Sequence, residues 1–280
     1  MPERAATQEA KEQDVAGRGE RVAVVTGGAG GIGRLLARRL VELGYRVVVA
    51  DANEAGVQKV AVELSSLGKG EHHWFAGDLT GTDANRRLAE QAASYGPLTV
   101  LVNAVGISPK GDNGRKKPFY DLSEEEWDLT MAVNLKAPFL LVKEAFRYMP
   151  TDGSASVVNL LSITSKLGTG GLPGADFPPY LPSSVAYAAS KGALQNLTAS
   201  LSRELAGFRI RVNGVAPGFV ATPMMAAVQG EDFHRMARQV PMGRFAGPHE
   251  VADAIEFLIS DKASYVNGTS LDVNGGWLTC

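Results

Sequence analysis

Short apolar runs rich in β-branched residues alternate along this chain with longer segments in which apolar residues recur every three or four positions. A short apolar run predicts a strand buried on both faces, and the longer spacing predicts an amphipathic helix. Strands alternating with helices are typical of a parallel sheet covered by helices on both faces. We therefore expect an α/β, doubly wound fold with about seven parallel strands. The expected strands are 21–26, 46–51, 72–76, 98–102, 156–161, 209–215 and 269–273, and the expected helices are 32–43, 55–67, 82–94, 123–146, 184–205, 224–240 (one or two) and 248–259.

The organisation of the chain follows from its length and from the polarity of its first residues. A chain of 280 residues is near the upper size for one hydrophobic core, so we expect a single domain over residues 20–280. Residues 1–19 are polar, carry both signs of charge and lack an apolar stretch, which predicts a disordered tail.

A glycine-rich turn joins the first expected strand to the first expected helix. Residues 27–33 read Gly-Gly-Ala-Gly-Gly-Ile-Gly. Glycines in this place let the backbone approach a pyrophosphate, and the helix N-terminus supplies N–H groups and a partial positive charge. The turn therefore predicts a Rossmann-type dinucleotide site. Two glycine patterns fit it, and spacing alone does not choose between them: Gly28, Gly30 and Gly33, or Gly27, Gly31 and Gly33 after Thr26.

The second expected strand ends in an acid, Asp51, at about the distance of 20 residues after the turn that dinucleotide sites show. A carboxylate there accepts hydrogen bonds from the adenosine ribose and repels a 2′-phosphate. The sequence therefore predicts NAD rather than NADP. No Arg or Lys lies within the glycine turn to argue otherwise, although Arg34 follows it directly.

A tyrosine and a lysine four residues apart, Tyr187 and Lys191, open the helical segment 184–205. Residues with this spacing lie on one helix face, so we expect the phenol and the ammonium side by side. A nearby cation lowers the pKa of a tyrosine toward working pH, and the phenol then becomes a usable general acid and base. Taken alone, the pair also fits a chance arrangement of an exposed lysine and a half-buried tyrosine.

Composition and charge exclude several other classes of function. A formal net charge of -2 gives no basic field for nucleic acid, and no apolar run reaches the length of a membrane span. Cys280 is the single cysteine, so no intramolecular disulfide forms, and with no signal-peptide pattern we expect a cytoplasmic protein. His72 and His73 are adjacent on a strand and point to opposite faces, while His234 and His249 lack partners at ligand spacing. We therefore expect no metal site. A serine hydrolase is not expected either, because the sequence has no G-x-S-x-G elbow.

Taken in their order along the chain, these motifs resemble those of the short-chain dehydrogenase/reductase family. The resemblance covers nearly all of 21–277, and it favours the glycine pattern of Gly27, Gly31 and Gly33. The residues that carry it are Thr26-Gly27-x-x-x-Gly31-x-Gly33, Asp78-Leu79, Asn103-Ala-Val-Gly106, Asn134, Ser162, Tyr187-x-x-x-Lys191, and Pro217-Gly218 with Thr222.

The resemblance implies a role for each matched residue. Tyr187 would be the general acid and base, and Lys191 would lower its pKa and hydrogen-bond the nicotinamide ribose. Ser162 would hold the substrate oxygen, and Asn134 would fix a water in a proton relay. The implied cofactor contacts are Gly27, Gly31, Ile32, Gly33, Asp51, Asp78, Leu79, Asn103, Gly106, Tyr187, Lys191, Pro217, Gly218, Val220 and Thr222.

The chain departs from the family pattern in three places. Ala104 stands where the family has a second Asn, and Asn274 stands where an Asp is more usual. Both departures concern structural hydrogen bonds and not the chemistry. The link between Ser162 and Tyr187 is much longer than the family's. If the extra residues shift the alignment, Ser165 competes for the role of catalytic serine, but Ser162 is preferred because it directly ends the expected strand.

These patterns together predict an NAD-dependent oxidoreductase that interconverts a secondary alcohol and a ketone of a small molecule. A non-catalytic dinucleotide sensor on the same fold is the alternative, since fold does not fix function. A sensor has no need of the full set Asn134, Ser162, Tyr187 and Lys191, which favours the enzyme. The resemblance also implies a homo-oligomer, either a dimer or a tetramer.

Two segments are expected near the substrate. Residues 166–183, rich in glycine and proline, are predicted to cover the substrate site because the segment begins just after Ser162 and ends just before Tyr187. A surface excursion or a subunit contact is the rival interpretation. Residues 223–245 carry Met and Phe side chains and are predicted to form substrate-loop helices, with core or subunit packing as the alternative.

Overall fold

Seven parallel strands form one sheet in the order β3-β2-β1-β4-β5-β6-β7. They come from a computed structural model of the chain, which describes residues 21–67, 70–111, 116–172, 175, 177–222, 225 and 230–279. The expected doubly wound α/β fold with seven parallel strands is thereby confirmed. The strands are β1 (Val22–Thr26), β2 (Arg46–Asp51), β3 (His73–Ala76), β4 (Leu98–Asn103), β5 (Ser156–Leu160), β6 (Arg211–Pro217) and β7 (Ser270–Val273).

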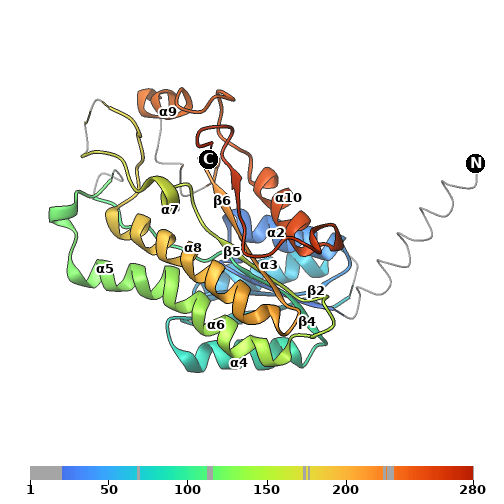
Figure 1. Cartoon of the computed structure of the whole chain (residues 1–280). Helices are drawn as coiled ribbons and strands as arrows, with labels where there is room; N and C mark the ends of the chain where they lie inside the picture. Colours follow the sequence, from blue (N-terminus) through green and yellow to red (C-terminus); the bar gives the residue numbers. More distant parts are fainter. Residues whose placement is uncertain are drawn as a thin grey trace, which may run out of the picture.

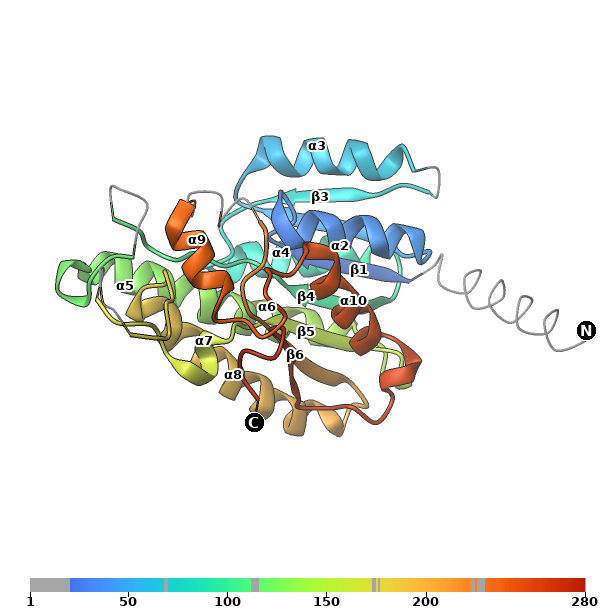
Figure 2. The same ribbon diagram turned by 90° about the horizontal axis from the view of Figure 1, so that it is seen from above.

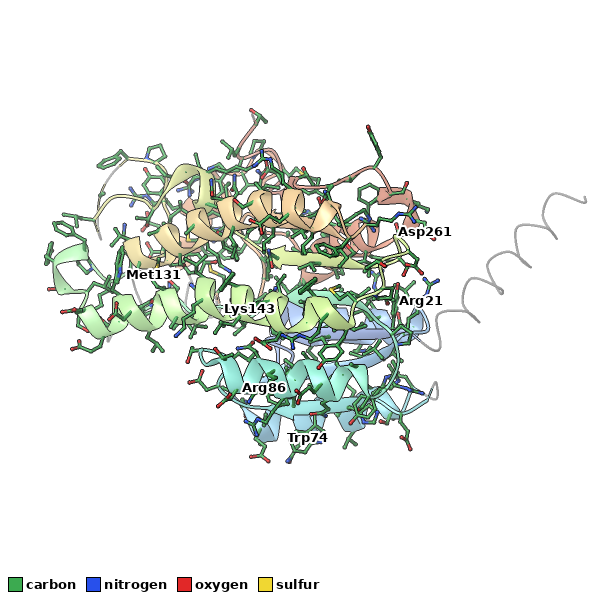
Figure 3. The ribbon with its side chains drawn as sticks, turned by 60° about the horizontal axis from the view of Figure 1, so that its bottom comes forward. Arg21, Trp74, Arg86, Met131, Lys143 and Asp261 are labelled. Carbon is green, nitrogen blue, oxygen red and sulfur yellow. The ribbon has the colours of Figure 1, made fainter. Side chains whose placement is uncertain are left out.

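Helices cover both faces of the sheet (Figure 1, Figure 2). Successive strand residues point to opposite faces, so Ala23 and Val25 pack with α2, α3 and α10, whereas Val22 and Val24 pack with α4, α6 and α8. Figure 3 shows this second group of helices, with Arg86 on α4 and Lys143 on α6. The helices are α2 (Gly31–Glu42), α3 (Glu54–Ser65), α4 (Thr82–Ala93), α5 (Glu124–Met131), α6 (Ala137–Ala145), α7 (Thr164–Leu167), α8 (Val185–Ala206), α9 (Gly230–Ala237) and α10 (Pro248–Ile259).

The helix expected over 123–146 is confirmed as one unbroken helical run from Glu124, although it is not α-helical throughout. Its start is confirmed, because Ser123 and Glu126 form the expected capping box before α5. A π-helical turn over Ala132–Lys136 then separates α5 from α6. Single π-turns inside helices often lie at functional sites, and Asn134 lies within this one.

Other element boundaries shift by one or two residues, and one of these shifts has a clear cause in the backbone. The strand expected over 209–215 begins only at Arg211, because Arg209 takes a left-handed conformation with φ of 58° that ends the preceding turn. Of the helices expected over 224–240, the structure describes α9, and residues 223, 224 and 226–229 lie outside the described part. The predicted tail over 1–19 also lies outside it.

The strand order reverses at β1, which pairs with β2 on one side and with β4 on the other. In open parallel sheets, ligands bind outside the carboxyl ends of the strands at such a reversal. The fold therefore places a binding crevice where β1 and β4 end. Within the described part of the chain, no helix combines the length and the apolar character needed to cross a membrane.

Candidate active site

A cavity of about 570 Å³ lies at the carboxyl ends of β1, β2, β4, β5 and β6. Its size is in the range of small-molecule and cofactor sites. Apart from Asn103, every residue proposed from the sequence as a cofactor contact lines it, and so does Ser162. They are Gly27, Gly31, Ile32, Gly33, Asp51, Asp78, Leu79, Gly106, Tyr187, Lys191, Pro217, Gly218, Val220 and Thr222.

The conformation of the glycine turn separates the two glycine patterns. Gly27 and Gly31 have φ of 66° and 54°, a region that side chains rarely adopt. At Gly33, a Cβ would come within 2.3 Å of the Gly27 carbonyl oxygen. Gly30 has an extended backbone instead. The pattern of Gly27, Gly31 and Gly33 is thus the one that the turn requires.

The end of α2 that faces the cavity has the properties of an anion site. Its N-cap, Gly30, offers no side chain, and its first turn carries no acid. The N–H groups of the first turn therefore lack a capping partner, and the helix dipole adds a partial positive charge. Around Gly30 and Gly31, no heavy atom lies within 4 Å of an ideal Cβ position, so the cavity has open space against the turn.

Asp51 lies at the end of β2, beside the glycine turn. Its Oδ2 accepts a hydrogen bond from the Ala29 N–H at 3.3 Å, and its Oδ1 accepts one from the Asn53 N–H at 3.0 Å. The Arg34 guanidinium, the nearest candidate partner for a 2′-phosphate, donates to Glu63 at 2.6 Å and does not line the cavity. Asp51 thus lines the cavity beside the glycine turn, whereas the Arg34 guanidinium is directed to Glu63.

Tyr187 and Lys191 both reach the cavity from the first turns of α8. Ser184 caps this helix by accepting the Tyr187 N–H at 3.2 Å, which fixes where the helix begins. Lys191 Nζ is buried, lies 5.8 Å from the centre of the Tyr187 ring and donates to the Leu160 carbonyl oxygen at 2.6 Å. The phenol and the ammonium are therefore neighbours, as their spacing predicted.

The long link after β5 leaves Ser162, not Ser165, beside the tyrosine. Ser162 lines the cavity, and its hydroxyl hydrogen-bonds Tyr187 and accepts the Thr164 N–H. The Ser165 hydroxyl donates to the Gln195 side chain at 2.5 Å and does not line the cavity. The structure therefore favours Ser162 of the two candidate serines.

Burial shifts the pKa values of Tyr187 and Lys191 in opposite directions. Burial raises the pKa of Tyr187 above its usual value, and the hydrogen bond with Ser162 offsets part of this rise. Burial lowers the pKa of Lys191 to about 8. The lowering of the tyrosine pKa by the lysine, expected from the sequence, is therefore not found: burial dominates, and the phenol is protonated at neutral pH.

Asn134 holds the loop that follows β4. Its Oδ1 accepts the Ile107 N–H at 2.8 Å, and its Nδ2 donates to the Ile107 carbonyl oxygen at 2.9 Å and to Ser190 Oγ at 3.0 Å. Both amide hydrogens are used by these bonds. The side chain thus fixes Gly106, whose Cβ position lies 3.4 Å from Lys191 Nζ, against the lysine.

Asn103 is buried behind the cavity instead of lining it. Its Nδ2 donates to Asn159 Oδ1 at 2.8 Å, and the Asn159 amide in turn donates to Thr198 Oγ1 on α8 at 2.9 Å. The residue therefore links β4, β5 and α8 through side chains. Its side chain gives no support for the cofactor contact that the family resemblance implied. Sequence reasoning did not pair these residues because the link spans three elements.

The two departures from the family pattern are accommodated by local hydrogen bonds. The N–H groups of Ala104 and Val105 donate to Thr26 Oγ1 at 3.1 and 3.3 Å, which ties the ends of β1 and β4 together. Asn274 Oδ1 accepts the Gly276 N–H at 3.0 Å, and its Nδ2 donates to the Leu278 carbonyl oxygen at 3.1 Å. Both positions are thus structural, as the sequence indicated.

The described residues of the segment 166–183 lie beside the loop after β4 and helix α9 (Figure 1). The Gln239 amide accepts the Tyr180 N–H at 2.7 Å and donates to the Tyr180 carbonyl oxygen at 3.2 Å. The Arg235 guanidinium lies 3.8 Å from the centre of the Tyr180 ring. Leu181 is buried and lines the cavity, whereas Phe177 is exposed. Only the last residues of the described segment therefore contribute to the cavity wall.

Several cavity residues were missed by sequence reasoning. Ser108 and Lys110 follow Gly106 on the loop after β4, and Ser183 ends the segment 166–183. The sequence feature that could have identified them is their position, either after the carboxyl end of a parallel strand or near a catalytic residue. Loop conformation decides which of these side chains face the cavity, and residue type alone does not give it.

Metal chemistry finds no ligand set in the described residues, because no three His, Cys, Asp or Glu side chains are grouped to hold an ion. His72 instead accepts the Val47 N–H through Nδ1 at 3.2 Å, and His73 stacks on Tyr95 at 3.5 Å between ring centres.

Comparison with known proteins finds relatives that match this chain over most of its length. A family model described as Enoyl-(Acyl carrier protein) reductase matches residues 27–278. Cis-4-hydroxycyclohexanecarboxylate dehydrogenase of Sinomonas cyclohexanicum is 39% identical over 259 residues, which cover 92% of this chain and 96% of that protein. The (3R)-3-hydroxyacyl-CoA dehydrogenase of Homo sapiens is 34% identical over 264 residues, which cover 91% of this chain and 94% of that protein.

Solved structures agree with this relationship. A short-chain dehydrogenase/reductase from Brucella melitensis, described as a glucose/ribitol dehydrogenase, is similar with a TM-score of 0.81 and 31% identity, over 93% of this chain and 98% of that one. The strand order, the cavity at the carboxyl ends and the placement of the family's motifs around it lead to the same result. The chain is therefore an oxidoreductase that belongs to the short-chain dehydrogenase/reductase family.

Proposed function

We propose that this protein is an NAD-dependent dehydrogenase that interconverts a secondary alcohol and a ketone, with Tyr187 as the general acid and base. One observation carries the proposal. Tyr187 hydrogen-bonds Ser162 and neighbours the buried ammonium of Lys191, and all three line the cavity that the glycine turn closes at its other end. An oxygen held between Ser162 and Tyr187 would lie beside a group that takes or gives its proton.

The residues around the cavity fit a nicotinamide dinucleotide. The uncapped start of α2 and the open space at Gly31 suit a pyrophosphate, and Asp51 suits the adenosine ribose. Lys191 would hydrogen-bond the nicotinamide ribose, and Thr222 would contact the nicotinamide amide. The bound cofactor would accept a hydride in oxidation and donate one in reduction.

The preference for NAD rests on charge at the end of β2. The Asp51 carboxylate would accept hydrogen bonds from two ribose hydroxyls and repel a 2′-phosphate. Arg34 is paired with Glu63 and is not available to bind that phosphate without giving up the ion pair. These two observations support NAD over NADP.

In oxidation, the Tyr187 phenolate would take the hydroxyl proton of the substrate while Ser162 donates a hydrogen bond to the same oxygen. The Lys191 ammonium would stabilise the phenolate electrostatically. In reduction, the protonated Tyr187 would give its proton to the ketone oxygen. Because burial raises the pKa of Tyr187, the protonated form is the one present at neutral pH. Ketone reduction is therefore favoured at neutral pH, and alcohol oxidation gains as the pH rises.

We propose an alicyclic secondary alcohol as the substrate class. The cavity wall around the catalytic oxygens includes the apolar side chains of Ile163, Leu181 and Phe219, which suit a compact hydrocarbon ring. The 39% identical relative is named for a hydroxylated cyclohexane acid. The relative named for 3-hydroxyacyl-CoA makes an acyl chain the second candidate. A homo-oligomer remains part of the proposal, supported by the exposed apolar side chains of Trp127 and Leu129 on α5.

The test is an assay of purified protein with NAD and with NADP, following the absorbance of the reduced nicotinamide. The panel holds cis-4-hydroxycyclohexanecarboxylate, a 3-hydroxyacyl thioester, a sugar and a steroid alcohol. The proposal predicts turnover of at least one secondary alcohol, with NAD preferred. A protein that binds NAD tightly and oxidises none of these alcohols would instead be the non-catalytic sensor.

A further inference from the structure

A lysine outside the catalytic set lies in the wall of the cavity at the substrate end. Lys110 is on the loop after β4, and its Nζ donates to the Pro182 carbonyl oxygen at 2.6 Å. The side chain is partly buried, and burial lowers its pKa. An ammonium has three donors, and Pro182 is its single hydrogen-bond acceptor among the described residues.

No carboxylate balances the charge of Lys110 in the described part of the chain. The acids that line the cavity, Asp51 and Asp78, are at its adenosine end, following β2 and β3. Burying a charge without a counter-charge costs free energy, and a bound anion recovers part of that cost. Among the described residues, the cavity therefore holds a positive charge without a counter-charge at the end where we propose that the substrate binds.

Two serine hydroxyls near Lys110 also lack hydrogen-bond partners among the described residues. The hydroxyls of Ser108 and Ser183 are buried and make no hydrogen bond in the described structure, and both residues line the cavity. Ser108 precedes Lys110 on the same loop, and Ser183 follows Pro182, the residue that Lys110 contacts. Buried polar atoms are rarely left unpaired, and those that are call for an explanation.

We propose that Lys110, with the hydroxyls of Ser108 and Ser183, forms a subsite for a carboxylate carried by the substrate, so that the physiological substrate is a hydroxy acid. This inference rests on the dehydrogenase activity proposed above and adds the charge of the substrate to it. Lys110 would be a binding residue that orients the alcohol toward Ser162 and Tyr187 and takes no part in proton transfer.

The residues of the subsite fit a carboxylate better than a phosphate. A carboxylate carries one negative charge, which one ammonium balances, and it accepts hydrogen bonds from hydroxyl donors. A phosphate group carries nearly two charges and three acceptor oxygens. Among the described cavity residues, the other cation is Lys191, which belongs to the catalytic set. The apolar side chains of Ile163 and Leu181 also line the cavity and suit the hydrocarbon ring of an alicyclic hydroxy acid.

The experiment compares cis-4-hydroxycyclohexanecarboxylate with its methyl ester, which has the same ring and hydroxyl but no charge. Steady-state rates are measured for the wild type, Lys110→Met and Lys110→Arg with saturating NAD. Hydrogen bonds to charged groups contribute enough to change binding by about ten- to 100-fold. We expect Lys110→Met to raise KM for the acid and lower the acid-to-ester ratio of kcat/KM by at least about tenfold, and Lys110→Arg to keep most of that ratio.

The chain offers a matched control in Lys116. Its Nζ donates to the carbonyl oxygens of Gly170 and Gly171, so it also ties the loop after β4 to the segment 166–183, but it does not line the cavity. Lys116→Met tests whether the loss of such a tether is by itself enough to lower the acid-to-ester ratio of kcat/KM. The proposal predicts that it changes the rates for the acid and the ester by the same factor.

A binding measurement keeps the inference testable if turnover is slow. Calorimetry of cyclohexanecarboxylate, added to the enzyme loaded with NADH, should give binding that Lys110→Met weakens at least about tenfold and Lys116→Met does not. An unchanged acid-to-ester ratio together with unchanged binding in Lys110→Met would overturn the subsite while leaving the dehydrogenase intact. Absence of any alcohol turnover, with Lys110-dependent binding of the acid kept, would contradict the dehydrogenase and not the subsite.

Discussion

Lys191 Nζ lies 5.8 Å from the centre of the Tyr187 ring and donates to the Leu160 carbonyl oxygen at 2.6 Å. The helix spacing of the two residues brings them together, and the end of β5 supplies the acceptor that aims the lysine. Burial lowers the pKa of this lysine to about 8, so its charge is held at neutral pH against a desolvation cost. The site thus maintains a cation beside the tyrosine at the expense of stability.

That cost predicts a stabilising substitution. The pKa of Lys191 is about 8 in the folded chain and 10.5 for an unburied lysine, so the unfolded state binds the proton more tightly. Below about pH 8 the folded chain carries the full cost, and stability recovers as the pH rises from 8 toward 10.5. We expect Lys191→Met to be more stable than the wild type at pH 7, by on the order of 2 kcal/mol after the lost hydrogen bond is counted.

Denaturant unfolding at pH 7 and at pH 10.5 checks this prediction. The advantage of Lys191→Met should shrink at the higher pH, while Lys143→Met, at an exposed position on α6, should show no such pH dependence (Figure 3). A stability difference between Lys191→Met and the wild type that does not change with pH would mean that the lysine is not buried as a charge.

The choice of cofactor should follow the charge of Asp51. Asp51→Asn keeps the shape and the hydrogen bond to the turn but removes the charge, whereas Asp51→Ala also removes the acceptor of the Ala29 N–H. We expect both variants to lose affinity for NAD by roughly tenfold or more, since hydrogen bonds to a charged group are lost. Both should gain activity with NADP because the repulsion of the 2′-phosphate is relieved.

The measurement is kcat/KM with each cofactor before and after substitution. Arg34→Gln serves as the control, because that side chain pairs with Glu63 and should leave the NAD-to-NADP ratio nearly unchanged. A wild type that already prefers NADP would refute this account of Asp51.

The segment 166–183 should act as a cover that α9 holds in place. Replacing 168–182 by a short Gly-Ser link should lower kcat/KM for the substrate strongly, since the residues lining the cavity at its end are removed, and should leave NAD affinity and oligomeric state unchanged. Gln239→Ala is the milder variant, because it removes two hydrogen bonds to Tyr180 without touching the cavity wall. We expect it to lower kcat/KM by up to about 30-fold, from two hydrogen bonds of about 1 kcal/mol each.

Gln58→Ala provides the control for loss of an amide, since Gln58 on α3 bonds only Glu54 among the described residues. Kinetics that stay normal without the segment would rule out the cover, and so would an oligomer that falls apart while each subunit keeps its activity. In that case the segment is a surface or subunit element.

Much of the fold was predictable because the signals were local. The strands β1 and β2 are continuous apolar runs, and the start of α5 is a capping box, so each is determined by residues next to one another. The glycine turn and the Tyr187–Lys191 pair are likewise short patterns, and the cavity contains both. Local chemistry was thus enough to bring the candidate site together.

The features that the sequence did not predict depend on contacts between distant segments. The π-turn at Asn134 occurs where its side chain bonds Ile107 and Ser190, neither of which lies on the same helix. Asn103 pairs with Asn159 on the neighbouring strand and so turns away from the cavity. The direction of the Tyr187 pKa also depends on burial by the whole fold. None of these contacts leaves a periodic pattern in the chain.

The most direct test of the account is the rate of hydride transfer in Tyr187→Phe. The substrate is the best secondary alcohol of the panel, and a single turnover is followed by the fluorescence of NADH in stopped flow, with NAD affinity measured by titration. General acid-base catalysis contributes roughly 10²–10⁴-fold, so the rate should fall by that factor while NAD binds as in the wild type. A variant that keeps more than about a tenth of the wild-type rate, outside the range expected for a lost acid-base group, would contradict the role of Tyr187.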